Sequence, residues 1–228
     1  MSNNLITIIL ISFSSFVISY VLSHLFLNYI KIDLIDKPGK RRIHKTPRPL
    51  IGGIIIYLVI TLLLAITNLT EPYNKFILFG LMLFFLVGLL DDYLDLSSLY
   101  KFSFPAIFSI LCSYIYTYFY LPNSDFFIFL LISFAIFFTV NAFNLVDGMD
   151  GLCISISIFS FFIFAIFCFL QSLDFLFLVS LISFFSLIAL FIFNKPPAKY
   201  FLGDSGTHQL GFLVACICLK IFMTENSG

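Results

Sequence analysis

The feature that most constrains this chain is a series of long apolar segments. Eight stretches of the 228-residue sequence are nearly free of charge. Most approach the roughly 20 residues that a helix needs to cross a hydrocarbon core about 30 Å thick. The sequence therefore predicts an all-α, polytopic membrane protein with about eight transmembrane helices, forming a single integral membrane domain over residues 1–228. The predicted spans are about 5–27, 50–69, 76–90, 103–121, 126–143, 152–170, 175–193 and 207–222.

The composition excludes a water-soluble globular protein. Charged residues make up 11% of the chain and 33 residues are Phe, which is too little charge to cover a surface in water. The formal net charge is zero, so no global field attracts nucleic acid, and membrane lipid is the expected surrounding. The five cysteines lie in or beside apolar runs without metal-ligand spacing, which is typical of buried thiols.

The basic residues predict which face each connection occupies. Eight spans place the connections 28–49, 91–102, 144–151 and 194–206 on one face. Only Lys75 and Lys220, of the 12 Lys and Arg residues, fall on the other face. Because positive charge is retained inside, the first face is predicted to be cytoplasmic. We expect a multi-pass membrane protein with these four connections on the cytoplasmic side.

The third apolar run ends in "GLLDDYLDL", with adjacent carboxylates at Asp91 and Asp92. Neighbouring carboxylates repel each other, and near a low-dielectric medium they are costly unless a cation neutralises them. A hard divalent ion such as magnesium suits such oxygen ligands. A solvated helix end without a ligand explains the pair equally well.

The fifth run ends in "NAFNLVDGMDG", where Asn144, Asp147 and Asp150 follow one another at intervals of three. A helical end would present them on one side. The alternative is a turn in which Asp147 or Asp150 caps the next helix. Capping explains Asp150 as well as a functional role does, but it does not explain an amide inside the apolar run.

The segment "YFLGDSGTHQLGF" places Asp204 between two glycines at the start of the last run. Gly203 and the amides of a starting helix could cradle phosphate, while Asp204 could hold a metal. A simple helix cap at Asp204 or Ser205 is the alternative. For His208, a hydrogen-bonded interface residue is favoured over a general base.

The fourth polar segment is the basic loop "KPGKRRIHKTPRPLIGG". Contact with anionic lipid and control of topology account for most of its charge. However, "PRPLIGG" leads into the second span with two prolines and two glycines, so His44 and Arg48 are candidates for positioned groups. Four polar segments that reach one face favour a metal–phosphate site over four unrelated explanations.

Together, "DKPGKRRIHKTPRPLIGG", "GLLDDYLDL", "NAFNLVDGMDGL" and "FLGDSGTHQLGF" resemble the polyprenyl-phosphate N-acetylhexosamine-1-phosphate transferases of glycosyltransferase family 4. The resemblance runs from about residue 33 to 215 and retains the family's order of motifs. The residues of "NAFN" and "RRIHKTPRP" are closer to the branch that transfers GlcNAc-1-phosphate. That branch primes O-antigen of lipopolysaccharide, enterobacterial common antigen or teichoic acid.

The resemblance implies a reaction that depends on Mg²⁺, or on Mn²⁺ in its place. A sugar-1-phosphate passes from a UDP-N-acetylhexosamine to undecaprenyl phosphate, and UMP leaves. Matching motif positions makes Asp204, Asn144 and Asp92 the metal ligands. Asp91 and Asp92 lie at the reaction centre, with Asp91 as base or orienting group, and a homodimer is left open. Phosphate neutralisation is assigned to Lys101 and to the basic loop with His44 and Arg48, phosphate binding through the backbone to Gly203, and the nucleotide side to Asp147 and Asp150. The resemblance also implies the bacterial inner (plasma) membrane, with the active site toward the cytoplasm.

The sequence departs from the family at its C-terminal end, "LKIFMTENSG". Relatives continue for two or three helices and carry a His-rich loop, so the expectation is that this C-terminal part is missing. The main alternative to the enzyme is a truncated, non-catalytic homologue that binds polyprenyl phosphate or a partner. A secondary transporter is least favoured, because transporters place ionisable groups near the middle of the membrane.

Overall fold

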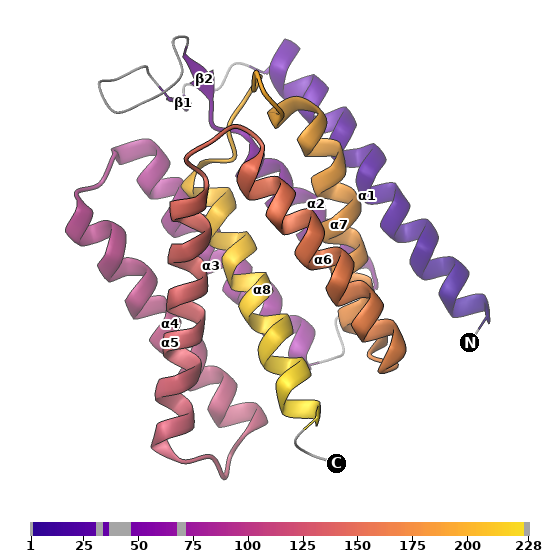
Figure 1. Ribbon diagram of the computed structural model, residues 1–228, viewed down its shortest axis with the longest axis vertical. Coiled ribbons are helices and arrows are strands. Elements are labelled where there is room, and N and C mark those ends of the chain that lie inside the picture. The colour runs from indigo at the N-terminus through magenta and orange to yellow at the C-terminus, as the bar shows by residue number, and fades with distance from the viewer. Residues whose placement is uncertain (1, 31–33, 37–46, 68–71, 226–228) are drawn as a thin grey trace.

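The computed structural model describes residues 2–30, 34–36, 47–67 and 72–225 as a bundle of helices (Figure 1). These residues form eight α-helices and one small antiparallel hairpin, in which Ile35 pairs with Pro49 and Asp36 with Arg48. The elements are α1 (Ser2–Asn28), β1 (Ile35–Asp36), β2 (Arg48–Pro49), α2 (Gly52–Thr67), α3 (Pro72–Leu94), α4 (Ser98–Tyr120), α5 (Phe126–Val146), α6 (Leu152–Leu170), α7 (Asp174–Asn194) and α8 (Gly203–Glu225).

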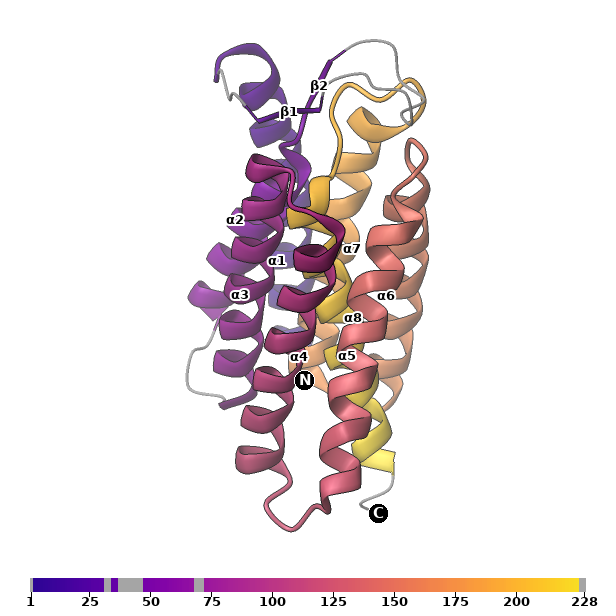
Figure 2. The ribbon, with the colours of Figure 1, turned by 90° about the vertical axis from the view of Figure 1, so that its left-hand side faces the viewer.

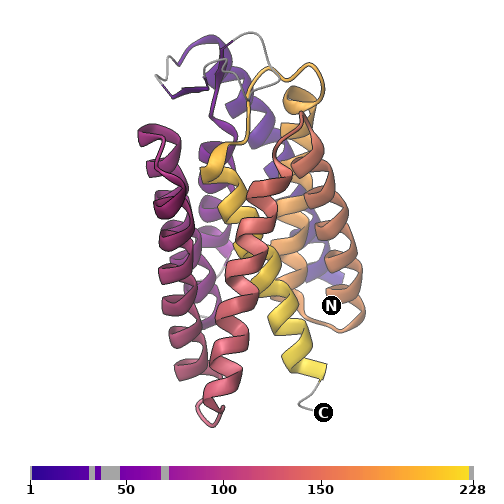
Figure 3. The ribbon, with the colours of Figure 1, turned by 60° about the vertical axis from the view of Figure 1, so that its left-hand side comes forward.

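The helices run side by side, so their connections alternate between two ends of the bundle. One end, at the top of Figures 2 and 3, carries the hairpin and the α3–α4, α5–α6 and α7–α8 connections. The α4–α5 turn and the C-terminal part of α8 lie at the other end. Within the described residues, which include only 28–30, 34–36 and 47–49 of the first connection, the prediction that the polar segments share one face is confirmed.

Seven of the eight helices are long and apolar enough to cross a membrane. The eighth, α2, is apolar but has 16 residues, or about 24 Å of helix, which is less than the predicted span of 50–69. Large apolar side chains such as Leu10, Phe134 and Phe159 are exposed on the outer helices, as lipid contact requires. The chain is an all-α, multi-pass membrane protein, as predicted.

The predicted helix ends need one correction. Helices α3, α5 and α8 do not stop where the apolar runs stop, but continue through Asp91, Asn144 and Asp204. Lys101 likewise lies in the first turn of α4 rather than in the preceding connection. Polar contacts described below, most of them with neighbouring helices, involve each of these residues at the bundle end. The candidate groups therefore stand on rigid helix ends.

Helix α8 is the central helix of the bundle, and nearly all its residues from Gly203 to Leu213 are buried. It packs against α2, α3, α5 and α6. Two close approaches depend on glycine in the neighbouring helix. A Cβ atom on Gly53 of α2 would overlap the backbone of Gly206, and one on Gly88 of α3 would overlap the backbone of Asp204 and Ser205. Small residues thus bring α8 within backbone contact of two helices.

The chain before α2 is fixed to the chain before α8. Leu50 forms an isolated bridge with Phe201, and the Phe201 N–H donates to the Pro49 carbonyl at 3.0 Å. The first N–H groups of α2, at Gly52 and Gly53, donate to the carbonyls of Phe201 and Leu202 at 3.1 and 2.9 Å. Because a helix N-terminus leaves its first N–H groups without partners inside the helix, this contact caps α2. The "PRPLIGG" segment therefore has a defined backbone conformation that links α2 to the start of α8.

We expect Gly88→Ala to destabilise the protein, because the new methyl group meets the α8 backbone, which cannot move aside. Overpacking of this kind costs roughly 2 kcal/mol. The better helix propensity of alanine offsets only about 1 kcal/mol. The measurement is the thermal unfolding midpoint of the purified protein in detergent. Gly148→Ala is the matched control, since Gly148 is exposed and its nearest neighbouring atom lies 4.0 Å away. Equal midpoints for the two variants would contradict the close α3–α8 contact.

Candidate active site

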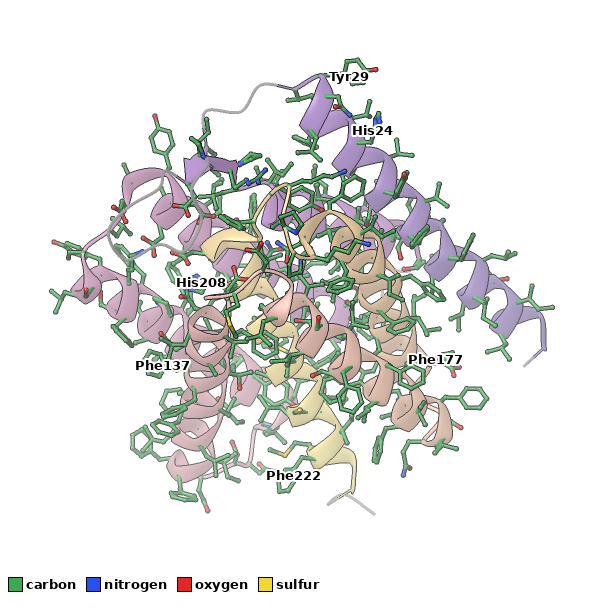
Figure 4. All side chains as sticks on the ribbon, turned by 45° about the horizontal axis from the view of Figure 1, so that its top comes forward. His24, Tyr29, Phe137, Phe177, His208 and Phe222 are labelled. Carbon is green, nitrogen blue, oxygen red and sulfur yellow. The ribbon has the colours of Figure 1, made fainter. Side chains whose placement is uncertain are left out.

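Four helix ends bring polar side chains together at the end of the bundle that carries the hairpin. Asp91 and Asp92 come from α3, Lys101 from α4, Asn144 from α5 and Asp204 from α8. Figure 4 shows oxygen and nitrogen atoms gathered in this region, with His208 beside them and away from His24 on α1. The sequence placed these groups on one membrane face, and the structure brings them into contact.

Lys101 bridges two of the carboxylates. Its Nζ atom lies 3.1 Å from Asp91 Oδ1 and 3.3 Å from Asp204 Oδ2. The Asp91 side chain is almost fully buried, and Oδ1 also accepts the Leu96 N–H at 3.1 Å. No hydrogen-bond partner for the buried Oδ2 atom of Asp91 is found within the described residues. A buried, unpartnered carboxylate oxygen is unfavourable unless a cation or donor reaches it.

Asp92 has a structural role that the sequence did not reveal. Its Oδ1 and Oδ2 atoms accept the backbone N–H groups of Asp204 and Ser205 at 2.7 and 3.0 Å. Asp92 therefore caps the N-terminus of α8 from another helix, where a negative charge is favoured. Gly203 makes room for it: its φ is 77°, and a Cβ atom there would lie 2.6 Å from Asp92 Oδ2. The metal role of Asp92 and the phosphate role of Gly203 stay predictions.

Asn144 joins α5 to α8 through its amide nitrogen. The Nδ2 atom donates to Asp204 Oδ1 at 2.9 Å and lies 3.2 Å from His208 Nε2. His208 is buried, which confirms the favoured interpretation of a hydrogen-bonded interface residue. Both oxygens of Asp204 thus contact neighbouring helices, and neither caps its own helix. The simple-cap explanation for Asp204 is wrong.

The cap explanation for Asp147 and Asp150 is also wrong. The N-cap of α6 is Gly151, whose N–H donates to the side chain of Asn194 and not to either aspartate. Asp150 instead accepts the Ala198 N–H at 2.9 Å, which ties the α5–α6 connection to the α7–α8 connection. Asp147 ends α5, and its pKa is raised to about 8 by burial and then by repulsion from Asp204, Asp92 and Asp150. These carboxylates are therefore near enough to interact.

Asn194 is a buried residue of this region that the sequence analysis missed. Its Oδ1 atom accepts the Gly151 N–H at 3.0 Å, and its Nδ2 atom donates to the Tyr200 carbonyl at 2.9 Å. The Tyr200 hydroxyl in turn lies 3.0 Å from Ser23 Oγ on α1. Asn194 therefore braces the two connections that flank the carboxylates. The only signal in the sequence is an amide at the end of the apolar run "LIALFIFN".

Of the two residues predicted from the basic loop, one is not described by the structure and the other does not join the cluster. His44 lies outside the described residues. Arg48 is on β2 opposite Asp36, and within the described part of the chain its side chain forms no ion pair with the clustered carboxylates. Their predicted phosphate role stays a prediction.

Negative charge exceeds positive charge in the cluster. Asp91, Asp92, Asp147 and Asp204 are close to one another, while Lys101 is the one basic side chain found bridging them among the described residues. No three His, Cys, Asp or Glu side chains of the described residues form a complete metal site. A cation here would therefore rest on a few protein oxygens together with oxygens of a bound molecule, which is a typical environment for Mg²⁺ between a protein and phosphate.

Comparison of the sequence with known protein families identifies a family for this chain. Residues 73–222 match the model described as "Glycosyl transferase family 4", and this range includes α4 to α7 and nearly all of α3 and α8. The match therefore covers every helix that contributes to the carboxylate cluster.

Individual relatives agree with this match. The undecaprenyl-phosphate alpha-N-acetylglucosaminyl 1-phosphate transferase of Thermotoga maritima is 32% identical over 195 residues, covering 84% of this chain and 58% of that protein. The phospho-N-acetylmuramoyl-pentapeptide-transferase of Bacillus mycoides is 30% identical over 239 residues, covering 91% and 73%. The Escherichia coli K12 counterpart of the first is 28% identical over 205 residues, covering 83% and 56%. The chain thus spans little more than half the length of most of these relatives, and it belongs to glycosyl transferase family 4.

Proposed function

We propose that this chain carries the reaction centre of a phospho-N-acetylhexosamine transferase. The reaction passes N-acetylglucosamine-1-phosphate from UDP-N-acetylglucosamine to undecaprenyl phosphate, giving undecaprenyl-diphosphate-N-acetylglucosamine and UMP. The names of the Thermotoga maritima and Escherichia coli relatives support this choice of acceptor and sugar. We expect the product to initiate a cell-envelope polysaccharide such as O-antigen or teichoic acid.

The observation that carries the proposal is the contact set of Asp204. Its carboxylate meets Lys101 from α4 and Asn144 from α5, while its own N–H is held by Asp92 from α3. Four helices therefore converge on one acidic residue at the bundle end. Two anionic phosphates can approach each other only where positive charge is concentrated and positions are fixed. This convergence supplies the fixed positions.

The residues present fit a magnesium ion. The donors are hard oxygens: Asp204, the buried Asp91 with its unpartnered Oδ2, and the side-chain oxygen of Asn144. When bound, Mg²⁺ would neutralise phosphate oxygens and stabilise the charge that develops in phosphoryl transfer. The described residues offer no Cys and His group that would suit zinc instead.

In the proposed reaction, an oxygen of the lipid phosphate forms a bond to the phosphorus that carries the sugar. The bond between that phosphorus and the bridging oxygen of UMP breaks, and UMP leaves with the electron pair. The lipid phosphate is already a nucleophile, so the protein needs no strong base. Asp91 orients the acceptor or takes its remaining proton, and Lys101 neutralises charge on the phosphates. The isoprenoid tail stays in hydrocarbon beside the exposed apolar faces of the helices.

Substitution of Asp204 tests the site. We expect Asp204→Asn to lower UMP release from UDP-N-acetylglucosamine and undecaprenyl phosphate by at least about 100-fold, because a charged ligand is lost at the reaction centre. Its thermal unfolding midpoint should stay near that of the unmutated protein. Asp92→Asn is the informative comparison, since it should lower both activity and stability by losing an acceptor for an α8 N–H group.

UMP release by Asp204→Asn at the unmutated rate, with saturating Mg²⁺, would remove Asp204 from the site. The unmutated protein is assayed both alone and with the C-terminal region of a relative supplied separately. Binding of undecaprenyl phosphate without UMP release in either case would favour the non-catalytic alternative.

The raised pKa of Asp147 gives a test of cation binding that needs no turnover. With a pKa of about 8, the Asp147 carboxyl holds its proton at pH 7 and loses it as the pH rises through 8. A divalent ion among these carboxylates lowers the pKa, so adding Mg²⁺ at pH 7 should release about one proton per chain. At pH 9.5 the carboxyl is already ionised and the release should vanish.

The proton released is measured with an indicator dye in weakly buffered detergent solution. Asp147→Asn should lower the release at pH 7, and the remainder would come from the neighbouring carboxyl groups of Asp91 and Asp92. Asp174→Asn, which changes a carboxylate at the start of α7 and the other end of the bundle, should leave it intact. Unchanged proton release from Asp147→Asn would show that Asp147 is not part of the cation site.

Single-cysteine labelling tests the proposed orientation in the bacterial inner membrane. In a cysteine-free background, Ser97→Cys in the α3–α4 connection should react with an impermeant reagent only after cells are opened. Asn123→Cys in the α4–α5 turn should react in intact cells. Both positions are exposed, so access depends on the side of the membrane. Labelling of Ser97→Cys from outside would reverse the predicted topology.

A further inference from the structure

We propose that Lys101 occupies the cation position of the metal-free site, so that its ammonium group and a divalent ion compete for Asp91 and Asp204. The inference rests on the metal site of the proposed function and adds a property to it. The Lys101 ammonium would be a displaceable internal counterion of the carboxylate pair. Its removal should strengthen metal binding even as it harms the reaction.

The first argument is geometric. Lys101 Nζ lies 3.1 Å from Asp91 Oδ1 and 3.3 Å from Asp204 Oδ2, so one charged group contacts oxygens from two different helices. A metal ion shared by these two carboxylates must also approach both of them. The ammonium and the ion carry like charge, and both cannot sit between the same carboxylates at close range.

The second argument concerns what the lysine leaves unsatisfied. Asp91 Oδ1 already accepts the Leu96 N–H in addition to Lys101, while Oδ2 is buried and lacks a partner among the described residues. The remaining oxygen of Asp204, Oδ1, accepts the Asn144 amide. One ammonium therefore satisfies this pair only in part, and a divalent ion could engage Oδ2 and supply the second positive charge. Asp91 and Asp204 therefore bind a divalent ion more favourably than the single ammonium group, once Lys101 can move away.

The third argument is that the Lys101 side chain can move out of the cluster into solvent. It lies in the first turn of α4, close to the α3–α4 connection, and 38% of its side chain is exposed. A lysine on a flexible four-carbon stem can turn toward solvent without moving the helix. Once released, the ammonium stays within reach of a phosphate bound at the site. An anionic substrate that attracts Lys101 therefore favours metal binding, and by linkage the metal favours the substrate.

The test measures Mn²⁺ binding to the purified full chain by electron paramagnetic resonance, without substrate. We expect Lys101→Met, which keeps the length of the side chain and removes its charge, to bind Mn²⁺ about tenfold more tightly than the unmutated protein. Loss of one charge-assisted contact corresponds to about this factor. Lys199→Met is the matched control. It removes one positive charge from the same end of the bundle, but Lys199 lies over the Phe193 ring rather than between carboxylates. Its Mn²⁺ affinity should stay within about twofold of the unmutated value.

Each outcome separates the two proposals. If the unmutated protein binds Mn²⁺ and Lys101→Met binds it equally or more weakly, competition is excluded while the metal site stands. If neither protein binds Mn²⁺, the metal site and the competition both fail. A purely structural lysine predicts weaker binding in the variant, because the ends of α3, α4 and α8 would separate. Lys101→Gln serves as a second neutral variant if Lys101→Met does not yield a monodisperse protein, and Lys101→Arg should retain the competition.

Discussion

The Asp92 carboxylate holds the start of α8, and the arrangement of the site depends on that contact. Its two oxygens accept the first N–H groups of the helix, which would otherwise be unsatisfied in the interior of the bundle. Gly88 and Gly203 make the contact possible, one by admitting the α8 backbone against α3 and the other by leaving space for the carboxylate. Once α8 begins at this point, Asp204 faces Lys101 and Asn144. The two adjacent aspartates thus have different roles: Asp92 fixes the start of α8, and Asp91 contacts Lys101 in the cluster.

A second layer of hydrogen bonds fixes the connections around the cluster. Asn194 and Asp150 join the α5–α6 connection to the α7–α8 connection, and the carbonyls of Phe201 and Leu202 cap α2. These contacts satisfy backbone groups at helix ends, where the chain leaves its regular hydrogen bonding. They also make the position of Asp204 depend on nearly every helix of the bundle. The polar residues therefore serve folding and chemistry together.

The electrostatic state of the cluster links structure to function. Burial, and then repulsion from neighbouring carboxylates, raises the pKa of Asp147 to about 8, and Asp91 keeps a buried oxygen without a partner in the described part of the chain. Both features reflect carboxyl groups removed from water without enough positive charge nearby, and a bound cation would relieve both. The carboxylates of the cluster thus carry more negative charge than Lys101 neutralises, although the helices that position them are in place. The proposed exchange between Lys101 and a divalent ion would supply the missing positive charge, and bound substrate phosphates would favour it.

The sequence by itself determined the class of the protein, its helices and the residues at issue. Length and hydropathy of each run predict helices because a membrane span needs about 20 apolar residues, and four polar motifs on one face follow from counting spans. The exact helix ends, the cap on α8 supplied by Asp92 and the brace formed by Asn194 came only from the tertiary structure. The contact of Asp92 with Asp204 joins residues 112 apart in the chain, and that of Asn194 with Gly151 joins residues 43 apart. Local sequence contains no record of such pairings. An aspartate that caps its own helix and one that caps another helix look the same in sequence, and only packing decides between them.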